Sequence, residues 1–258
     1  MTTKLKFWGS QGHYLSARLD MPDEALNDGK PLAYALFAHC FTCGKDLVPA
    51  NRVVQALNDD GIAVMRFDFT GINESQGKFE DTNFTSNVAD IIAAADYMRK
   101  TMDAPSLMIG HSLGGTATLV AAAQVEEVKA VATIGAPSNT TNVMKQFGCD
   151  IETIEREGAA EVKLAGRPFT IKKQFLDDIK SQDIKAAVQG LKKPLLICHS
   201  PIDDTVPIDH AADIYSWAMH PKSFVSLNTH DHLLFADGAA EYVARTVAAW
   251  ASAYLPQK

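Results

Sequence analysis

The sequence has 258 residues, 47% of them hydrophobic and 21% charged, which indicates a globular domain rather than a disordered chain. A formal net charge of −7 disfavours a nucleic-acid-binding surface, which is normally basic. No apolar run reaches the roughly 18–20 residues needed to span a bilayer. Residues 1–20 alternate polar and apolar side chains and lack the apolar centre of a signal peptide. We therefore expect a cytoplasmic protein of one domain.

Strand signals come first along the chain. Apolar residues alternate on both sides of a turn at residues 9–12, which predicts an antiparallel hairpin at the N-terminus. Short continuous apolar runs follow, and such runs are typical of parallel strands buried on both faces. The runs cover residues 32–38, 62–69, 106–110, 128–135, 194–198 and 223–227.

Helical patterns separate these runs. Residues 84–100 carry an apolar stripe at helical spacing, residues 113–124 are rich in alanine and leucine, and residues 239–254 form a long amphipathic segment. Alternating strands and helices predict the α/β class, with a mostly parallel central sheet, an antiparallel N-terminal hairpin and helices on both faces. We expect a single domain over residues 1–258.

Residues 138–190 break this rhythm because they are largely polar. Residues 161–164 and 168–171 flank a glycine turn and predict a small hairpin. The simplest placement is a cap or lid over the C-terminal edge of the sheet, where ligands bind in open α/β folds. The alternative is a peripheral decoration unrelated to the substrate.

Four cysteines, Cys40, Cys43, Cys149 and Cys198, are too few and too scattered to suggest a disulfide framework. The C-x-x-C pair at residues 40 and 43 could be a redox dithiol or half of a metal site. No second pair follows, so we interpret both as small buried residues beside a loop and expect no metal.

The strongest local motif is G-H-S-L-G at residues 110–114, placed between a predicted strand and a predicted helix. This is the nucleophile-elbow pattern in its required strand–turn–helix context. It predicts Ser112 as a nucleophile at a helix N-terminus, where free N–H groups favour negative charge.

A nucleophilic serine needs a base and an orienting acid, in the chain order Ser, Asp or Glu, His for this kind of site. His232 lies in the loop after the last apolar run and is followed by two leucines, which favours it over His230. The acid should lie in residues 199–207, where Asp203 and Asp204 are adjacent. Spacing alone does not choose between them, and the other aspartate is expected to cap the following turn.

An oxyanion hole needs two backbone N–H groups. One is expected from Leu113, directly after the nucleophile. The second is expected from Phe41, in the loop after the strand at residues 32–38.

With these residues in place, the chain resembles the α/β-hydrolase superfamily, and is most similar to the hydrolase half of proteins fused to an OsmC-type domain. The likeness rests on the motifs H-C-F-T-C, R-F-D-F-T-G, G-H-S-L-G-G, G-R-P-F, H-S-P-I-D and P-K-S-F-V-S-L. The superfamily's loop pattern H-G-x-x-D-x-x-V-P implies that Asp203 is the acid, and a segment similar to the family's D-H-L-L implies that His232 is the base. The sequence ends at Lys258, so we expect a hydrolase unit without the OsmC-type domain.

These features together predict a serine hydrolase that cleaves carboxylic esters with a small or medium acyl group, without a cofactor. The expected partner is a small-molecule ester, and the oligomeric state is not indicated. An aminopeptidase or thioesterase would use the same triad, and acidic residues Glu152, Glu155 and Glu157 could bind an amino group. A non-catalytic binding protein on the same scaffold is the third alternative.

Overall fold

A twisted sheet of eight strands forms the centre of the protein, in the order β1-β2-β4-β3-β5-β6-β9-β10. The computed structural model describes residues 1–23 and 30–256. Only the pairs β1–β2 and β2–β4 of this sheet are antiparallel, and the other neighbours run parallel. The strands are β1 (Thr2–Trp8), β2 (Tyr14–Asp20), β3 (Ala33–Ala38), β4 (Ile62–Phe67), β5 (Leu107–His111), β6 (Ala130–Ile134), β9 (Leu195–His199) and β10 (Lys222–Ser226).

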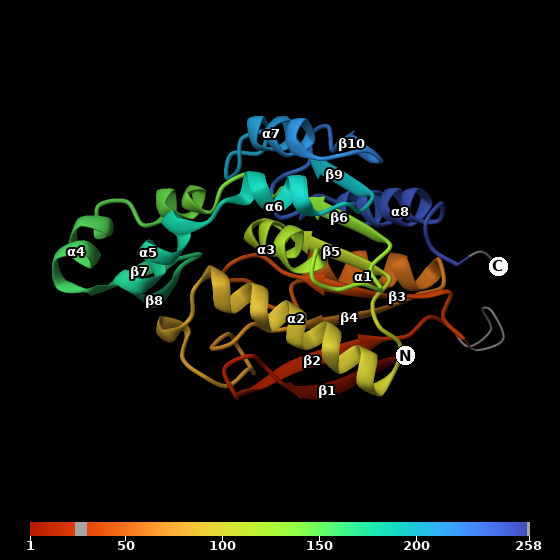
Figure 1. The fold of residues 1–258 in the computed structure, drawn as a ribbon, viewed down its shortest axis with the longest axis horizontal. Helices are drawn as coiled ribbons and strands as arrows, with labels where there is room; N and C mark the ends of the chain where they lie inside the picture. The colour runs from red at the N-terminus through yellow and green to blue at the C-terminus, as the bar shows by residue number, and fades with distance from the viewer. Residues whose placement is uncertain (24–29, 257–258) are drawn as a thin grey trace.

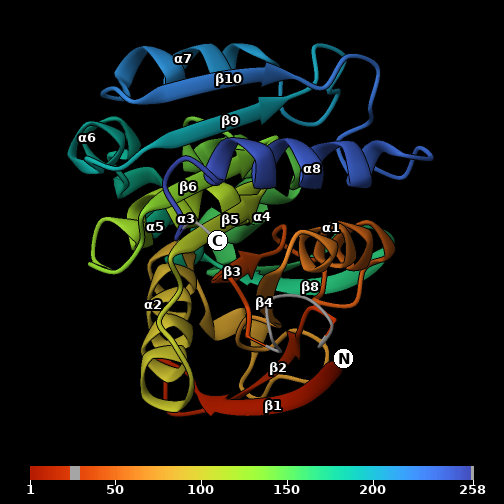
Figure 2. The same cartoon turned by 90° about the vertical axis from the view of Figure 1, so that its right-hand side faces the viewer.

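Helices cover both faces of this sheet (Figures 1 and 2). Helices α1 and α8 contact each other on one face, whereas α2 and α3 pack together on the opposite face. The helices of these layers are α1 (Val48–Asp59), α2 (Phe84–Thr101), α3 (Leu113–Ala122), α7 (Asp209–Trp217) and α8 (Ala239–Ala251), with a short 3-10 turn η2 (Phe79–Asp81). The fold class predicted from the sequence is confirmed.

Local sequence explains where these elements begin. Asn83 accepts a hydrogen bond from the N–H of Ser86, whose hydroxyl in turn accepts from the N–H of Asn83, so α2 starts with a complete capping box. Pro49 stands in the first turn of α1, where its missing N–H costs no hydrogen bond. Strands β3 to β6 are buried along nearly their whole length, as their continuous apolar runs predict.

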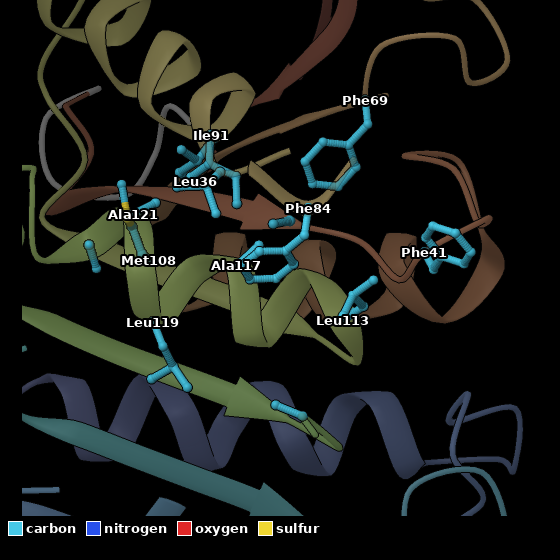
Figure 3. Close-up of a cluster of buried hydrophobic side chains, with 14 of the residues drawn as sticks. Leu36, Phe41, Phe69, Phe84, Ile91, Met108, Leu113, Ala117, Leu119 and Ala121 are labelled. Atoms are coloured by element: carbon cyan, nitrogen blue, oxygen red, sulfur yellow. The ribbon is translucent and has the colours of Figure 1, made fainter. Parts of the chain in front are cut away.

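The side chains between the sheet and helices α2 and α3 form one buried apolar cluster, part of which Figure 3 shows. Phe84 and Ile91 of α2 meet Met108 of β5 and Ala117 of α3 within this cluster. At one end of it lie Leu113 and other side chains from the region of the predicted site. The core therefore extends directly beneath the loops that carry the predicted chemistry.

The segment between β6 and β9 contains all of residues 138–190, and much of it extends to the left in Figure 1. Its elements are η3 (Thr140–Gln146), α4 (Asp150–Glu157), β7 (Ala159–Leu164), β8 (Arg167–Lys172), α5 (Lys173–Ser181) and α6 (Ile184–Gly190). The expected hairpin is present as the antiparallel pair β7–β8. Helix α6 contacts α3 and α7, so the end of the segment rejoins the main helical layer. Cys149, at the start of α4, has an exposed free thiol.

Candidate active site

Ser112 stands at a sharp turn between β5 and α3. Its φ of +55° is a left-handed value that residues other than glycine rarely adopt, and its N–H donates to the Ile134 carbonyl at 2.8 Å. A Cβ on Gly110 would lie 2.6 Å from the Gly114 carbonyl oxygen, and a Cβ on Gly114 would lie 2.1 Å from the His39 carbonyl oxygen. Both motif glycines are thus required by close backbone approach.

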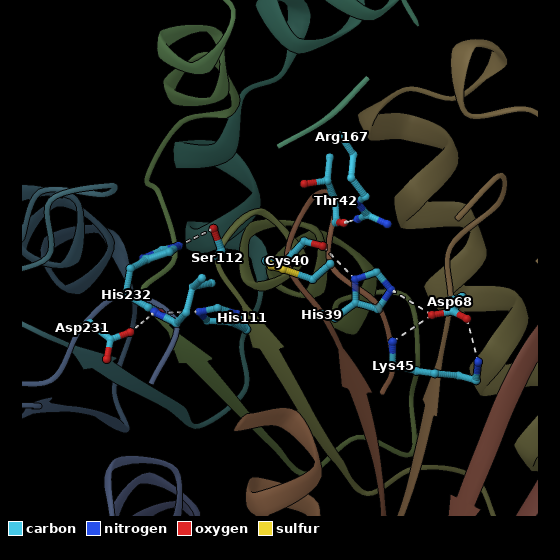
Figure 4. Close-up of a disulfide and its surroundings, with 12 residues drawn as sticks. His39, Cys40, Thr42, Lys45, Asp68, His111, Ser112, Arg167, Asp231 and His232 are labelled. Carbon is cyan, nitrogen blue, oxygen red and sulfur yellow. Dashed lines mark hydrogen bonds and ion pairs between the residues drawn. A yellow bond between two sulfur atoms is a disulfide. The ribbon is translucent and has the colours of Figure 1, made fainter. Parts of the chain in front are cut away.

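The three side chains predicted as nucleophile, base and acid form one hydrogen-bonded chain. His232 Nε2 lies 2.9 Å from Ser112 Oγ, as Figure 4 shows, and His232 Nδ1 lies 2.7 Å from Asp203 Oδ2. Each of the three residues is only 8% exposed. They follow strands β5, β10 and β9, whose carboxyl ends meet at one edge of the sheet.

Asp203 uses its two carboxylate oxygens differently. Its Oδ1 accepts the N–H groups of Thr205 at 3.0 Å and Val206 at 2.8 Å, which leaves Oδ2 for His232. The neighbouring Asp204 is exposed and, among residues 1–23 and 30–256, accepts only the Thr205 hydroxyl, at 3.1 Å. The expectation that the second aspartate caps the turn is therefore wrong, because Asp203 both caps the turn and contacts the histidine.

The loop that carries His232 is shaped by Asp231. Its carboxylate accepts backbone N–H groups that follow in the chain, from Leu233, Phe235 and Ala236. His230 lies elsewhere, with its ring 5.9 Å from the ring of Tyr242, measured between centroids. Of the two histidines weighed in this loop, the structure brings His232 to Ser112.

The surroundings of Asp203 favour its negatively charged carboxylate form. Burial acts to raise the pKa of Asp203, but hydrogen bonds from His232, Val206 and Thr205 outweigh it and leave the pKa below its usual range. The carboxylate therefore remains charged at neutral pH and can stabilise a protonated imidazole.

Two further buried histidines support this side of the site, and the sequence patterns did not single them out. His111 Nε2 donates to the His232 carbonyl at 2.7 Å, and His199 Nε2 donates to the Val206 carbonyl at 2.7 Å. Burial, together with the nearby His232, lowers the pKa of His111 to about 3, and burial also lowers the pKa of His199. Both are neutral at physiological pH. In the sequence, they are marked only by their positions: His111 directly precedes Ser112, and His199 begins the loop expected to carry the acid.

The two predicted oxyanion donors belong to different segments, the start of α3 and the loop after β3. Leu113 is the first residue of α3, where N–H groups have no acceptor within the helix. Phe41 lies in the loop after β3, and its ring is buried against an aromatic cluster. The partners are Phe79, Phe147 and Phe175, with centroids 5.4, 6.4 and 5.2 Å from that of Phe41.

A cavity of about 430 Å³ opens at Ser112 and His232. Its walls combine the loop after β3, the acid and base loops and two parts of the segment between β6 and β9. The other lining residues are Cys40, Phe41, Thr42, Cys43, Lys145, Gln146, Ala165, Asp204, Thr205 and Leu233. The site can therefore admit a small organic molecule next to the serine hydroxyl.

Cys40 and Cys43 form a disulfide within the loop after β3. The interpretation of both as small buried residues is therefore incomplete, because they are bonded to each other and Cys43 is only half-buried. The bridge closes a turn in which the Cys43 N–H also donates to the Cys40 carbonyl, at 3.2 Å.

Within residues 1–23 and 30–256, no group of three or more His, Cys, Asp and Glu side chains is arranged to hold a metal ion. In the same part of the chain, no helix has the length and apolar character needed to cross a membrane.

Comparisons with known proteins agree with this architecture. The family described as "alpha/beta hydrolase fold" matches residues 36–148. The crystal structure of the esterase domain from a Rhodothermus marinus protein is 41% identical, with a TM-score of 0.78, and the alignment covers 98% of this chain and 99% of that one. The ferulic-acid-bound Est1E of Butyrivibrio proteoclasticus, 24% identical over 96% of this chain and 98% of its own with a TM-score of 0.77, shows the same fold.

Among curated relatives, the mitochondrial palmitoyl-protein thioesterase ABHD10 of Rattus norvegicus is 29% identical over 57% of this chain and 46% of its own length. Human protein ABHD12B is 23% identical over 76% of this chain and 52% of its own length. The chain thus spans about half the length of these relatives. Near-complete alignment at 41% identity with an esterase domain, with a TM-score of 0.78, is decisive. The chain belongs to the α/β-hydrolase fold family and is an esterase-like member of it.

Proposed function

We propose that this protein is a serine esterase that cleaves carboxylic esters with a small or medium acyl group. The observation that carries the proposal is the continuous hydrogen-bonded chain from Ser112 through His232 to Asp203. A serine hydroxyl is a weak nucleophile, and it becomes reactive when a base within hydrogen-bond reach is itself oriented by a third group. This arrangement meets both requirements at the mouth of a cavity.

In the proposed reaction, Ser112 Oγ attacks the ester carbonyl while His232 Nε2 takes the hydroxyl proton. Asp203 stabilises the resulting imidazolium, which then donates its proton to the departing alcohol. Water enters, gives a proton to His232 and attacks the acyl-enzyme carbonyl. As the bond to Ser112 Oγ breaks and the carboxylic acid leaves, His232 returns the proton to that oxygen. The N–H groups of Phe41 and Leu113 stabilise the oxyanion in both halves of the reaction.

The size of the cavity supports the substrate class. A volume of about 430 Å³ lies in the lower half of the range for small-molecule sites, which suits an ester of modest length. Lys145, Gln146 and Ala165 of the segment between β6 and β9 line this cavity. We therefore propose that residues 138–190 act as a cap within one hydrolase domain. The motifs that resemble those of hydrolases fused to OsmC-type domains support a proposed kinship with that group.

The direct test is initial-rate hydrolysis of p-nitrophenyl esters of increasing acyl length, with the Ser112→Ala variant as control. We expect turnover that depends on Ser112 and declines once the acyl chain exceeds the cavity. Turnover that survives in the variant would refute the nucleophile assignment. A fluorophosphonate should label the wild type and not the variant, whereas absence of both labelling and turnover would favour a non-catalytic binding protein.

A thioesterase is the second candidate, because one curated relative is a palmitoyl-protein thioesterase. The same three side chains would attack a thioester, so the geometry does not separate the two activities. Rates on matched p-nitrophenyl and thiophenyl esters of one acyl group decide between them. A thioester preference of more than about 100-fold would move the proposal to that class.

An aminopeptidase is less well supported. Two of the three acidic residues expected to bind an amino group are paired on the surface, since Glu155 contacts Lys180 at 2.7 Å and Glu157 contacts Arg156 at 2.8 Å. Arylamide substrates provide the comparison, and turnover of arylamides above that of esters would reverse this order.

A further inference from the structure

Residues 39–45, here called the oxyanion loop, carry the proposed donor Phe41 and end on a buried ion pair. Lys45 is 2% exposed and Asp68, just after β4, is fully buried. The Lys45 N–H donates to Asp68 Oδ1 at 2.8 Å, and Lys45 Nζ donates to Asp68 Oδ2 at 2.7 Å (Figure 4). One carboxylate thus holds both the main chain and the side chain of the residue that ends the loop.

Further contacts fix Lys45 from other directions. Its Nζ also donates to Glu74 Oε2 at 2.9 Å, and the Arg66 guanidinium donates to its carbonyl oxygen. Asn73 Nδ2 donates to Asp68 Oδ1 at 3.3 Å and so holds the carboxylate in turn. The end of the oxyanion loop cannot shift without separating buried charged groups.

The middle of the loop is held from two sides. His39 is neutral because burial lowers its pKa, and its Nδ1 lies 2.7 Å from the Cys40 carbonyl oxygen. Arg167 of β8 donates to the Thr42 carbonyl oxygen from the opposite side (Figure 4). These two carbonyl groups directly flank Phe41 in the chain.

A buried ion pair is a poor way to gain stability, because desolvation offsets much of its attraction. It does impose a defined geometry, and an oxyanion donor must lie within about 2.7–3.1 Å of its target. We propose that Lys45 and Asp68 are positioning residues that hold the Phe41 N–H in the oxyanion hole, with Arg167 acting from the cap side. This inference rests on the proposed esterase function.

The test compares Asp68→Asn and Lys45→Met with wild type in ester hydrolysis and in binding of a phenylboronic acid. Boronic acids form a tetrahedral adduct with the serine and place an oxygen in the oxyanion hole. We expect kcat to fall about 10- to 100-fold, while KM changes by less than about twofold. The dissociation constant of the boronate should rise by about the same factor as kcat falls.

Asp90→Asn is the matched control, because Asp90 is an equally buried carboxylate whose hydrogen-bond partners in the described structure are Ser10 and Thr70. It should lower the melting temperature without changing kcat or boronate affinity. If Asp90→Asn behaves in this way, a general loss of stability does not explain a fall in kcat and boronate affinity in Asp68→Asn.

Arg167→Gln keeps the inference testable if the buried variants do not fold, since Arg167 is exposed. Its kcat and boronate affinity should fall together, about 3- to 10-fold. Wild-type kcat in these variants, or lower kcat with unchanged boronate affinity, would overturn the inference. A wild-type protein that neither hydrolyses esters nor reacts with a fluorophosphonate would instead overturn the proposed function.

Discussion

The two sides of the candidate site, the base side around His232 and the oxyanion loop, are supported by different kinds of interaction. On the side of the base, His111 and His199 are kept neutral and donate single hydrogen bonds to backbone carbonyls. On the side of the oxyanion loop, Lys45 and Asp68 form a buried ion pair. In the proposed mechanism, proton transfer requires particular side chains on the base side, whereas the oxyanion loop contributes a main-chain N–H group. Substitutions should therefore remove chemistry on the base side and displace backbone on the other.

The sharpest way to test this contrast is Ser112→Ala. We expect kcat to fall by about four to six orders of magnitude, because no other group takes over the role of the nucleophile. The melting temperature should change little, since His232 is the only hydrogen-bond partner of the hydroxyl in the described part of the chain. Steady-state hydrolysis and thermal unfolding measure the two quantities. A loss smaller than 100-fold would mean that the base side does not depend on this serine.

The next effect concerns the two adjacent aspartates. Asp203→Asn should lower kcat by about 10⁴ by favouring the wrong histidine tautomer, with the fold retained. Asp204→Asn is the control, because its carboxylate contacts only the Thr205 hydroxyl within the described structure. The pH–rate profile of each variant provides the measurement. Greater damage from Asp204→Asn would reverse the assignment.

Because its buried histidines are neutral, the protein should become less stable as the pH falls. The pKa of His111 is about 3 in the folded protein and about 6.5 when unfolded, so the unfolded state binds more protons between these values. The contribution of His111 is complete above pH 6.5 and is lost as the pH falls toward 3. It amounts to about 2 kcal/mol between pH 7.5 and pH 5.

Urea unfolding of wild type and His111→Gln at pH 7.5 and pH 5 tests this value. The variant should lose about 2 kcal/mol less than wild type between the two pH values, whatever its absolute stability. His39 and His199 remain in both proteins and act in the same direction. Equal losses would mean that His111 is not kept neutral by the fold.

The smallest effect is expected at an exposed ion pair. Lys180 and Glu155 lie 2.7 Å apart on the surface, with 43% and 49% of their side chains exposed. Replacing Lys180 by Gln should change the free energy of unfolding by less than about 1 kcal/mol, because solvent screens the pair. Glu155→Gln should leave ester and arylamide rates unchanged. A selective loss of arylamide turnover would revive the amine-binding role of this residue.

Much of this organisation could be predicted from the sequence, since it depends on local pattern. Buried parallel strands require continuous apolar runs, and the nucleophile turn requires glycines at fixed spacing around Ser112. The positions of Asp203 and His232 followed from chain order and superfamily likeness, and their catalytic roles stay predictions. The structure places His232 beside the serine and Asp203 beside His232.

The supporting residues could not be predicted in the same way. Asp68 and Lys45 are 23 residues apart in sequence and meet only because β3 and β4 are neighbours in the sheet. His111 contacts a carbonyl group 121 residues further along the chain. A sequence motif identifies the reacting side chain. It does not show which distant backbone groups the residues next to that side chain will contact.

The free cysteines make the segment between β6 and β9 accessible to spectroscopy. In the described part of the chain they are Cys149, which is exposed, and Cys198, whose thiol is buried and has a pKa raised to about 12 by burial. A maleimide spin label or fluorophore added without reductant should therefore attach at Cys149 alone. The sequence thus provides a single-site reporter at the start of α4, from which any movement of the proposed cap during turnover can be recorded without engineered cysteines.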